Sequence, residues 1–316
     1  MRRFVIRRLL AMIPTILAVS MIAFSIILLL PGDPALAILG EQRANDRQAY
    51  EALRKDLGLD RPIPIQYLDW VGKALHGNLG ISVRNRQPVM EGILQRLPAT
   101  MMLTLCAMAI GLLVALPVGI ISAVKPNSKL DVSGTLFAMS GVAIPDFWLG
   151  IVLIFLLAVT LRWLPPSGFV SPFEDAGASL KLMIMPAFTL STGLAAVITR
   201  QVRSALIEVL QQDYIVTARA KGLRELLVVR RHALKNALIP VLTVIGLQTG
   251  RLFGGAAVVE TIFSIPGVGR LAVDSIYYRD FPMVQGVVLV LAMAVLIANL
   301  ITDVLYAGID PRIRLT

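Results

Sequence analysis

The chain has 316 residues, of which 56% are hydrophobic and 16% are charged, and its formal net charge is +10. Its mean hydropathy is +0.76. Soluble domains carry about 25% charged residues, so the composition excludes an ordinary soluble protein and predicts surface that faces lipid. The cations gather at the edges of apolar runs and are not interleaved with aromatic residues, which argues against nucleic-acid binding. The single cysteine, Cys106, excludes a disulfide within the chain.

The first apolar run covers residues 9–30 and follows four arginines in the first eight residues. A secretory signal is the obvious alternative for such a run. Its apolar core would be about 7–15 residues long and would end in small residues suited to cleavage, which "LLLPGDPA" does not offer. We therefore expect an uncleaved transmembrane helix.

Five further apolar runs are long enough to span a bilayer. A hydrocarbon core about 30 Å thick needs roughly 20 residues at about 1.5 Å each in a helix. The run 133–160 is interrupted by Ile144, Pro145 and Asp146, which predicts a kink or an excursion from the membrane. The sequence therefore predicts an all-α polytopic membrane protein in one domain, 1–316, with six spans. The five later spans are expected at about 100–124, 133–160, 182–205, 236–260 and 283–307.

The distribution of basic residues predicts the orientation. Cations precede the first span, fill the second and fourth connections and end the chain, whereas the other connections are mixed or nearly neutral. The positive-inside rule places the basic ends in the cytoplasm, and six spans put both termini there. Residues 31–98 then form an external loop, in which the apolar spacing predicts two short amphipathic helices, one ending near Leu57 and one ending near Leu75.

A basic segment, 206–235, lies between the fourth and fifth apolar runs. Apolar residues every four positions from Leu206 to Ala218 predict one helix, and a second helix follows Gly222, which suits a left-handed turn. We call residues 206–235 the basic hairpin. The alternative is a basic loop that rests on anionic lipid, worth about 1 kcal/mol per cation, but such a loop needs no defined bend.

Two stretches of this hairpin, "DYIVTARAKGL" and "RRHALKNALIP", resemble the cytoplasmic coupling loop of ATP-binding cassette (ABC) importer permeases, specifically the dipeptide/oligopeptide/nickel group. Supporting stretches are "LLPGDPA", "VVETIFSIPGVGRL" and "YAGIDPRIR", so the resemblance covers nearly the whole chain. The sequence departs from the general pattern where Val216, Thr217 and Ala218 replace Glu-Ala-Ala and where Leu234–Lys235 replaces Leu-Pro. The peptide subgroup commonly has such replacements.

The resemblance implies a type I permease fold in a bacterial or archaeal cytoplasmic membrane. It also implies two cytoplasmic ATPase subunits that use ATP and Mg, a homologous second permease and an external solute-binding protein. The chain has no phosphate-binding GxxxxGK[ST] motif, so we expect it to bind no cofactor and to be no enzyme by itself. The residues expected to contact the ATPase are Tyr214, Ala218, Ala220, Lys221, Gly222, Leu223, Leu226, Arg230 and Arg231.

Three charged residues lie among apolar neighbours: Asp146, Arg251 and Glu260. A charge at the middle of a membrane costs about 2.5–3.5 kcal/mol, so these side chains are expected to line a polar translocation path. The alternative places Asp146 and Glu260 in water near the outer surface. His76 and His232 have no metal-ligand company in the sequence, so no metal site is predicted.

The resemblance also suggests a re-entrant external gate at Phe263, Pro266, Gly267 and Gly269, although the same residues suit an ordinary loop. The predicted function is a permease subunit that forms half of the path for di- and oligopeptides or a related small solute. The alternative is an ion- or proton-coupled secondary transporter acting alone. That class uses paired carboxylates or broken helices near the midplane, and Asp146 beside Pro145 is the one suggestive site.

Overall fold

The computed structural model of the protein describes residues 2–29, 46–56 and 59–309. In these ranges the elements are helices, and one isolated antiparallel bridge joins Ile81 to Pro88. The all-α prediction is therefore confirmed. The contacts divide the chain into two compact units, which are described separately: residues 1–6, 99–266 and 295–316 form unit 1, and residues 7–98 and 267–294 form unit 2. The single-domain assignment of 1–316 stays a prediction.

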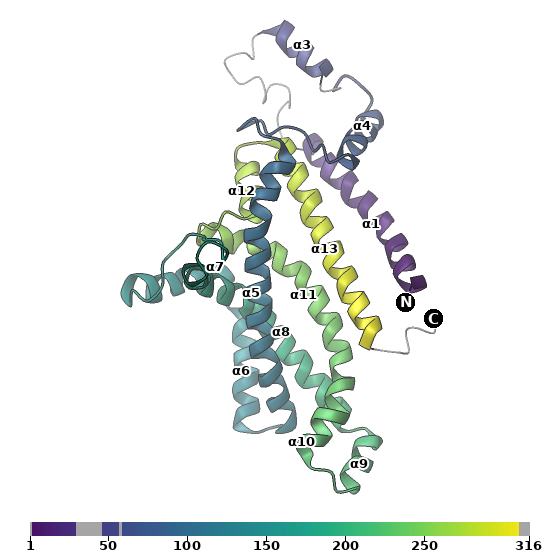
Figure 1. Cartoon of the computed structure of the whole chain (residues 1–316), viewed down its shortest axis with the longest axis vertical. Coiled ribbons are helices and arrows are strands. Elements are labelled where there is room, and N and C mark those ends of the chain that lie inside the picture. Colours follow the sequence, from purple (N-terminus) through teal and green to yellow (C-terminus); the bar gives the residue numbers. More distant parts are fainter. Residues whose placement is uncertain (1, 30–45, 57–58, 310–316) are drawn as a thin grey trace. The chain divides into compact units, whose positions relative to one another are not determined.

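Five helices are long and apolar enough to cross a membrane, and a bent helix pair provides a sixth candidate if its two parts count as one span. Figure 1 shows these helices along the colour gradient. The six predicted runs each fall on one of these candidates. The five long helices are α1 (Arg2–Leu29), α5 (Val89–Val124), α8 (Ala176–Leu210), α11 (Leu234–Ile262) and α13 (Phe281–Ile309).

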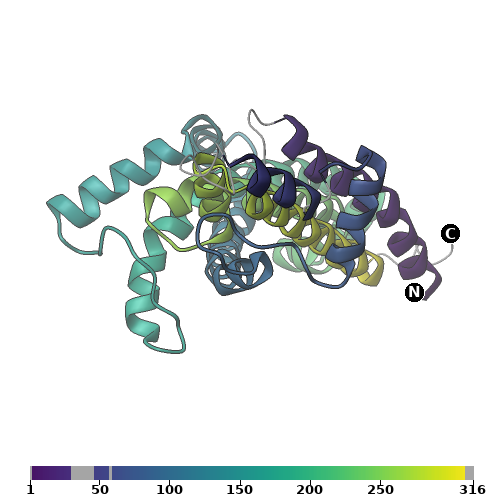
Figure 2. The ribbon, with the colours of Figure 1, turned by 90° about the horizontal axis from the view of Figure 1, so that it is seen from above.

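The bent pair explains the interruption predicted at residues 144–146. Helix α6 (Lys129–Ala143) meets α7 (Asp146–Leu153) and the π-helix η2 (Ile154–Thr160) at an angle of 101°. Pro145 has no backbone N–H and disfavours a helical conformation in the residue before it, and Ile144 accordingly has an extended ψ of 121°. Figures 1 and 2 show α7 and η2 running sideways from the end of α6.

The core of unit 1 is built around α8, which packs against α6 and α11. The buried face of α8 includes Met183, Leu194, Ile198 and Val202. Small residues on the neighbouring helices allow a close approach. A Cβ added at Gly119 of α5 would lie 2.8 Å from the Cβ of Val202. Such small-residue contacts are how membrane helices bring their backbones together.

Unit 2 contains α3 (Arg47–Asp56), α4 (Ile63–Leu75) and α12 (Val268–Tyr277), besides parts of the long helices. Helices α3 and α4 lie at the two places where the sequence predicts helices between residues 31 and 98; residues 30–45 and 57–58 of that loop lie outside the described ranges. The buried Asp280 carboxylate accepts hydrogen bonds from the Ser82 hydroxyl and, at 3.1 Å, from the Val83 backbone N–H. These bonds attach the loop before α5 to the start of α13.

Candidate functional site

The basic hairpin begins with the last turn of α8 and continues through α9 (Asp213–Ala220), a turn, α10 (Glu225–Leu227) and the π-helix η3 (Val228–Ala233) into the start of α11. Figure 1 shows α9 and α10 beyond the ends of α8 and α11. The prediction of one helix from Leu206 through Ala218 is wrong, because α8 ends at Leu210 and α9 is a separate helix. Gln212 is extended (φ −74°, ψ 148°) and breaks the helix, and Asp213 in the first turn of α9 suits the positive end of a new helix dipole.

The turn of the hairpin has the predicted left-handed conformation. Gly222 has a φ of +78°, and its N–H donates to the Arg219 carbonyl at 2.9 Å. A Cβ added at Gly222 would meet no atom within 4 Å. The glycine is therefore required by its backbone conformation and not by a lack of space.

An ion pair bridges the two sides of this turn. The Arg219 guanidinium donates two hydrogen bonds to the Glu225 carboxylate, at 3.1 Å and 2.7 Å. This hydrogen bonding is the main reason why the pKa of Arg219 is raised above its usual value. Both side chains are about half exposed, so the pair adds less than about 1 kcal/mol of stability but favours one geometry of the turn.

The inner face of the hairpin is packed. Ile215, Val228 and Ala233 are fully buried and belong to the same apolar core as Leu206 of α8. At the rim, the Asn236 amide donates to the Tyr214 hydroxyl at 2.9 Å and ties α9 to the beginning of α11. The hairpin is therefore held on unit 1 by apolar burial.

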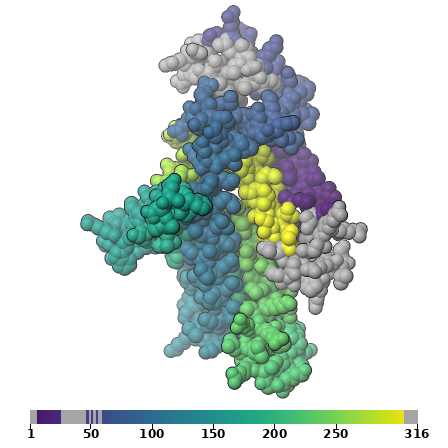
Figure 3. Space-filling view, viewed as in Figure 1, coloured from purple at the N-terminus to yellow at the C-terminus, as the bar shows by residue number. Residues whose placement is uncertain are grey.

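The outer face of the hairpin exposes an apolar side chain among cations. Leu226 is 79% exposed, and Tyr214 is 43% exposed. Of the predicted ATPase-contacting residues, Ala218 is buried in the hairpin's own core and Leu223 is half-buried. In Figure 3 the hairpin forms the green surface at the lower end of the view. The predicted residues that are exposed are Tyr214, Ala220, Lys221, Gly222, Leu226, Arg230 and Arg231.

Two of the three predicted pathway residues line one cavity. An open cavity of about 330 Å³ lies between α6, α7, α8 and α11. Its wall is mostly apolar, and its polar side chains are those of Asp146, Gln248 and Arg251. We call it the Asp146–Arg251 cavity. Glu260 is not among the residues of its wall; it is fully buried and accepts a hydrogen bond of 2.6 Å from the Thr100 hydroxyl. The assignment of these residues to a translocation path stays a prediction.

The four predicted gate residues lie where α11 ends and α12 begins. In unit 1, the buried Phe263 directly follows α11 as its C-cap, and its carbonyl accepts a hydrogen bond of 2.9 Å from the Gly168 N–H. Pro266 is exposed. In unit 2, Gly267 precedes the first residue of α12 and Gly269 lies in its first turn. Their role as a gate stays a prediction.

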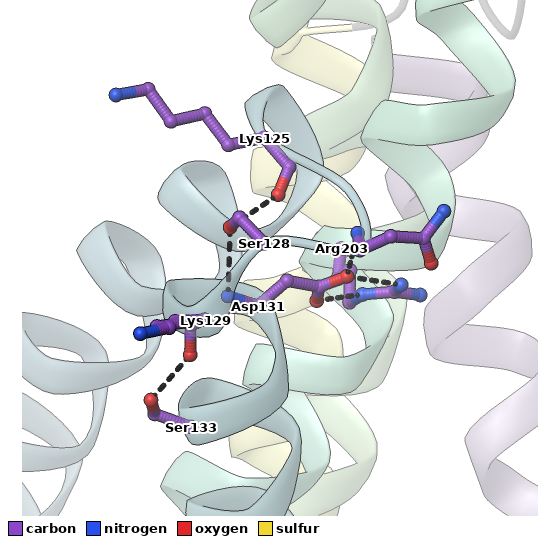
Figure 4. A network of polar contacts seen from close by, with 7 residues as sticks. Lys125, Ser128, Lys129, Asp131, Ser133 and Arg203 are labelled. Atoms are coloured by element: carbon purple, nitrogen blue, oxygen red, sulfur yellow. Dashed lines mark hydrogen bonds and ion pairs between the residues drawn. The ribbon is translucent and has the colours of Figure 1, made fainter.

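One ion pair in unit 1 was not predicted from the sequence. The Arg203 guanidinium of α8 donates to both Asp131 carboxylate oxygens of α6, at 2.6 Å and 2.8 Å. Figure 4 shows this pair, with the amines of Lys125 and Lys129 directed away from it. The sequence signal that could have revealed this pair is Arg203 itself, a cation near the end of the apolar run 182–205, because a charge in a membrane span needs a partner.

Long apolar helices, an open cavity with charged residues among them and a basic hairpin define a multi-span membrane protein. The chain belongs to the family described as the binding-protein-dependent transport system inner membrane component, whose model matches residues 115–315. A model for the N-terminal part of such membrane components matches residues 1–104. The predicted class, a permease subunit of an ABC importer, is therefore confirmed, and the secondary-transporter alternative is not favoured.

Two relatives match over nearly their full length. The glutathione transport system permease protein GsiC of Pectobacterium atrosepticum is 44% identical over 315 residues, 99% of each chain. The dipeptide transport system permease protein DppB of Escherichia coli K12 is 42% identical over 340 aligned positions, again 99% of each chain. A solved structure of the MetNI methionine ABC transporter is similar in fold, with a TM-score of 0.57 and 21% identity over 69% of this chain and 95% of the other.

Proposed function

We propose that this chain forms half of a translocation path for di- and oligopeptides and that the basic hairpin couples the path to a cytoplasmic ATPase. The observation that carries the coupling is the hairpin's geometry. A left-handed turn at Gly222 and the Arg219–Glu225 pair present Leu226, which is 79% exposed, at the tip of a packed two-helix element. A protein cleft would bury that side chain, whereas a loop resting on lipid requires neither the turn nor the pair.

The relatives and the Asp146–Arg251 cavity support a peptide substrate. The names of two similar proteins specify dipeptide and glutathione transport. A free peptide carries an ammonium group at one end and a carboxylate at the other, and the cavity wall offers both a carboxylate and a guanidinium. Opposite charges of this kind complement a zwitterion and disfavour a solute with one sign of charge.

The complex that we propose contains a homologous second permease, two ATPase subunits and an external solute-binding protein. ATP and Mg are used by the ATPases, and this chain supplies no nucleotide site. Closure of the ATPases on ATP draws the two hairpins together and opens the path outward, where the binding protein releases its solute. Hydrolysis returns the path to the inward-open state.

Replacing Arg251 with leucine is expected to lower peptide uptake at least about tenfold, the effect of losing one charge-assisted hydrogen bond. Arg251 is exposed in the cavity wall, so the change leaves the apolar core of unit 1 intact. Uptake should be compared at matched amounts of assembled complex, with Arg251→Lys as the variant that keeps the charge. Equal uptake by Arg251→Leu and the unchanged protein would place Arg251 outside the path.

We expect residues 31–98 and 161–175 to lie on the external side of the membrane and Asn127 to lie on the cytoplasmic side. The reason is that basic residues concentrate in the connections assigned to the cytoplasm. Single cysteines at Glu51, Asn127 and Glu174, in a Cys106→Ala background, should show this orientation. An impermeant thiol reagent applied to intact cells should label positions 51 and 174, and position 127 only after lysis. The opposite pattern would reverse the topology.

A further inference from the structure

A second cavity in unit 1 has a wall that is apolar on one side and basic on the other. It has a volume of about 490 Å³ and lies between α5, α6 and α8. Met139 and Val142 of α6 belong to its apolar side. The polar residues of its wall are Ser122, Thr135, Thr199, Arg200, Arg203 and Ser204.

Of the two guanidinium groups in the wall of this cavity, one has a carboxylate partner and the other has none within the described ranges. Arg203 is held by the Asp131 carboxylate, whose side chain is only 4% exposed, so this pair contributes little net charge. Arg200 lies three residues away on the same face of α8, and no hydrogen bond or ion pair of its side chain occurs among the described residues. The wall of the cavity therefore carries one uncompensated positive charge.

Two buried hydroxyl groups of the same wall lack hydrogen-bond partners. In the part of the chain that the structure describes, three buried side-chain oxygens have none, and two of them, on Ser122 and Thr199, belong to residues of this cavity. Other hydroxyls of α8 bond to the helix itself, as the Thr189 hydroxyl does to the Met185 carbonyl at 2.8 Å. Buried polar groups are normally paired, so two unpaired hydroxyls in a wall that also contains Arg200 indicate an absent acceptor.

The second cavity adjoins the Asp146–Arg251 cavity. Val142 belongs to the walls of both. Along α8, Gly193 lines the first cavity and Arg200 lines the second, and seven residues of helix correspond to about 10 Å. The two cavities are therefore neighbours along α8, with the Arg200 guanidinium in the wall of the second.

We propose that Arg200, Ser122 and Thr199 form an oxyanion site, in which the guanidinium binds a carboxylate or phosphate group and the two hydroxyls donate hydrogen bonds to it. The expected occupant is the carboxylate of the transported solute, bound after it leaves the Asp146–Arg251 cavity. This occupant rests on the proposed function. The other source of the same chemistry is the phosphate of an anionic phospholipid.

The test uses the assembled permease–ATPase complex in phosphatidylcholine nanodiscs and measures its thermal midpoint. Three probes are compared: dialanine, dialanine amide, which lacks the carboxylate, and nanodiscs with added phosphatidylglycerol. The variants are Arg200→Gln, Arg200→Lys and Thr199→Val. Lys129→Gln serves as the control, because it removes one exposed cation from α6 at a position outside the wall of the cavity.

Dialanine should raise the midpoint of the unchanged complex and of Lys129→Gln, and dialanine amide should raise it less. Arg200→Gln should need at least about tenfold more dialanine for the same shift, the effect of one lost charge-assisted hydrogen bond, and Arg200→Lys should lie between the two. Thr199→Val should weaken the dialanine response but raise the midpoint without ligand, since it removes an unpaired buried hydroxyl. If the site bound no ligand, Thr199→Val would raise the midpoint but leave the response to dialanine unchanged.

If phosphatidylglycerol, and not dialanine, produces a shift that Arg200→Gln abolishes, the oxyanion site stands and its occupant is a lipid phosphate. If Arg200→Gln responds like Lys129→Gln to dialanine and to phosphatidylglycerol, the site is refuted. A failure of peptide transport has a different signature. The unchanged complex would then show no uptake of any dipeptide delivered by its binding protein, while the phosphatidylglycerol comparison would still decide whether Arg200 binds an oxyanion.

Discussion

Replacing Gly222 with valine is expected to abolish most ATP-driven uptake while the chain still inserts into the membrane. Gly222 has a φ of +78°, and a β-branched residue in this conformation costs about 1–3 kcal/mol. The surrounding space is open, so the strain can be relieved only by moving the turn between α9 and α10. That movement displaces Leu226 from the position in which the hairpin presents it.

Three measurements separate the effects of Gly222→Val. Membrane fractionation reports insertion, co-purification with the ATPases reports docking, and the stimulation of ATP hydrolysis by solute-loaded binding protein reports coupling. Gly222→Asn should retain most coupling, because asparagine tolerates a positive φ better than other side chains. Normal uptake and full stimulation in Gly222→Val would remove the hairpin's proposed role in coupling.

Gly77 offers a matched control for backbone strain. It has a φ of +79°, and a Cβ added there would also meet no atom within 4 Å. It follows α4 in unit 2, far in sequence from the hairpin. Gly77→Val should therefore place a similar strain in the chain but leave most of the stimulation of ATP hydrolysis in place.

Replacing Asp131 with asparagine is expected to destabilise unit 1 by about 3 kcal/mol, the lower end of the range for a buried pair that loses one partner. The Asp131 side chain is 4% exposed and that of Arg203 is 31% exposed, so the guanidinium would remain partly desolvated without its counter-ion. The change also weakens the hydrogen bond of 2.9 Å from the Asn127 N–H, which closes the turn before α6. Thermal unfolding of the purified complex and its abundance in the membrane measure the effect.

A surface pair and a double substitution control this result. Arg61 and Asp69 form an ion pair of 2.7 Å in which both side chains are about half exposed, so Asp69→Asn should cost less than about 1 kcal/mol. Adding Arg203→Gln to Asp131→Asn should restore part of the lost stability, because the uncompensated charge is then removed. If Asp131→Asn is no more destabilising than Asp69→Asn, the pair does not hold α6 against α8.

Several features of this protein follow from the sequence because their causes are local. The length of an apolar run determines whether a helix can span the membrane, and the predicted runs fall on the long helices or on the bent pair. Pro145 ends α6 through its own ring and missing N–H, and Gly222 occupies a left-handed turn because other residues adopt that conformation at a cost. Residues near each of these positions supply the whole physical reason.

Only the tertiary structure decided which side chains come together. Asp131 and Arg203 are 72 residues apart, and they meet because α6 packs on α8. Asp146 and Arg251 share a cavity, whereas Glu260, which the same apolar context singled out, is buried against Thr100. The four-residue spacing that predicted one helix through Ala218 gave no sign of the break at Gln212, because α9 packs through Ile215 on a core that residues distant in the sequence also form. Hydrophobic periodicity records that a face is buried, but packing between distant helices determines what it is buried against.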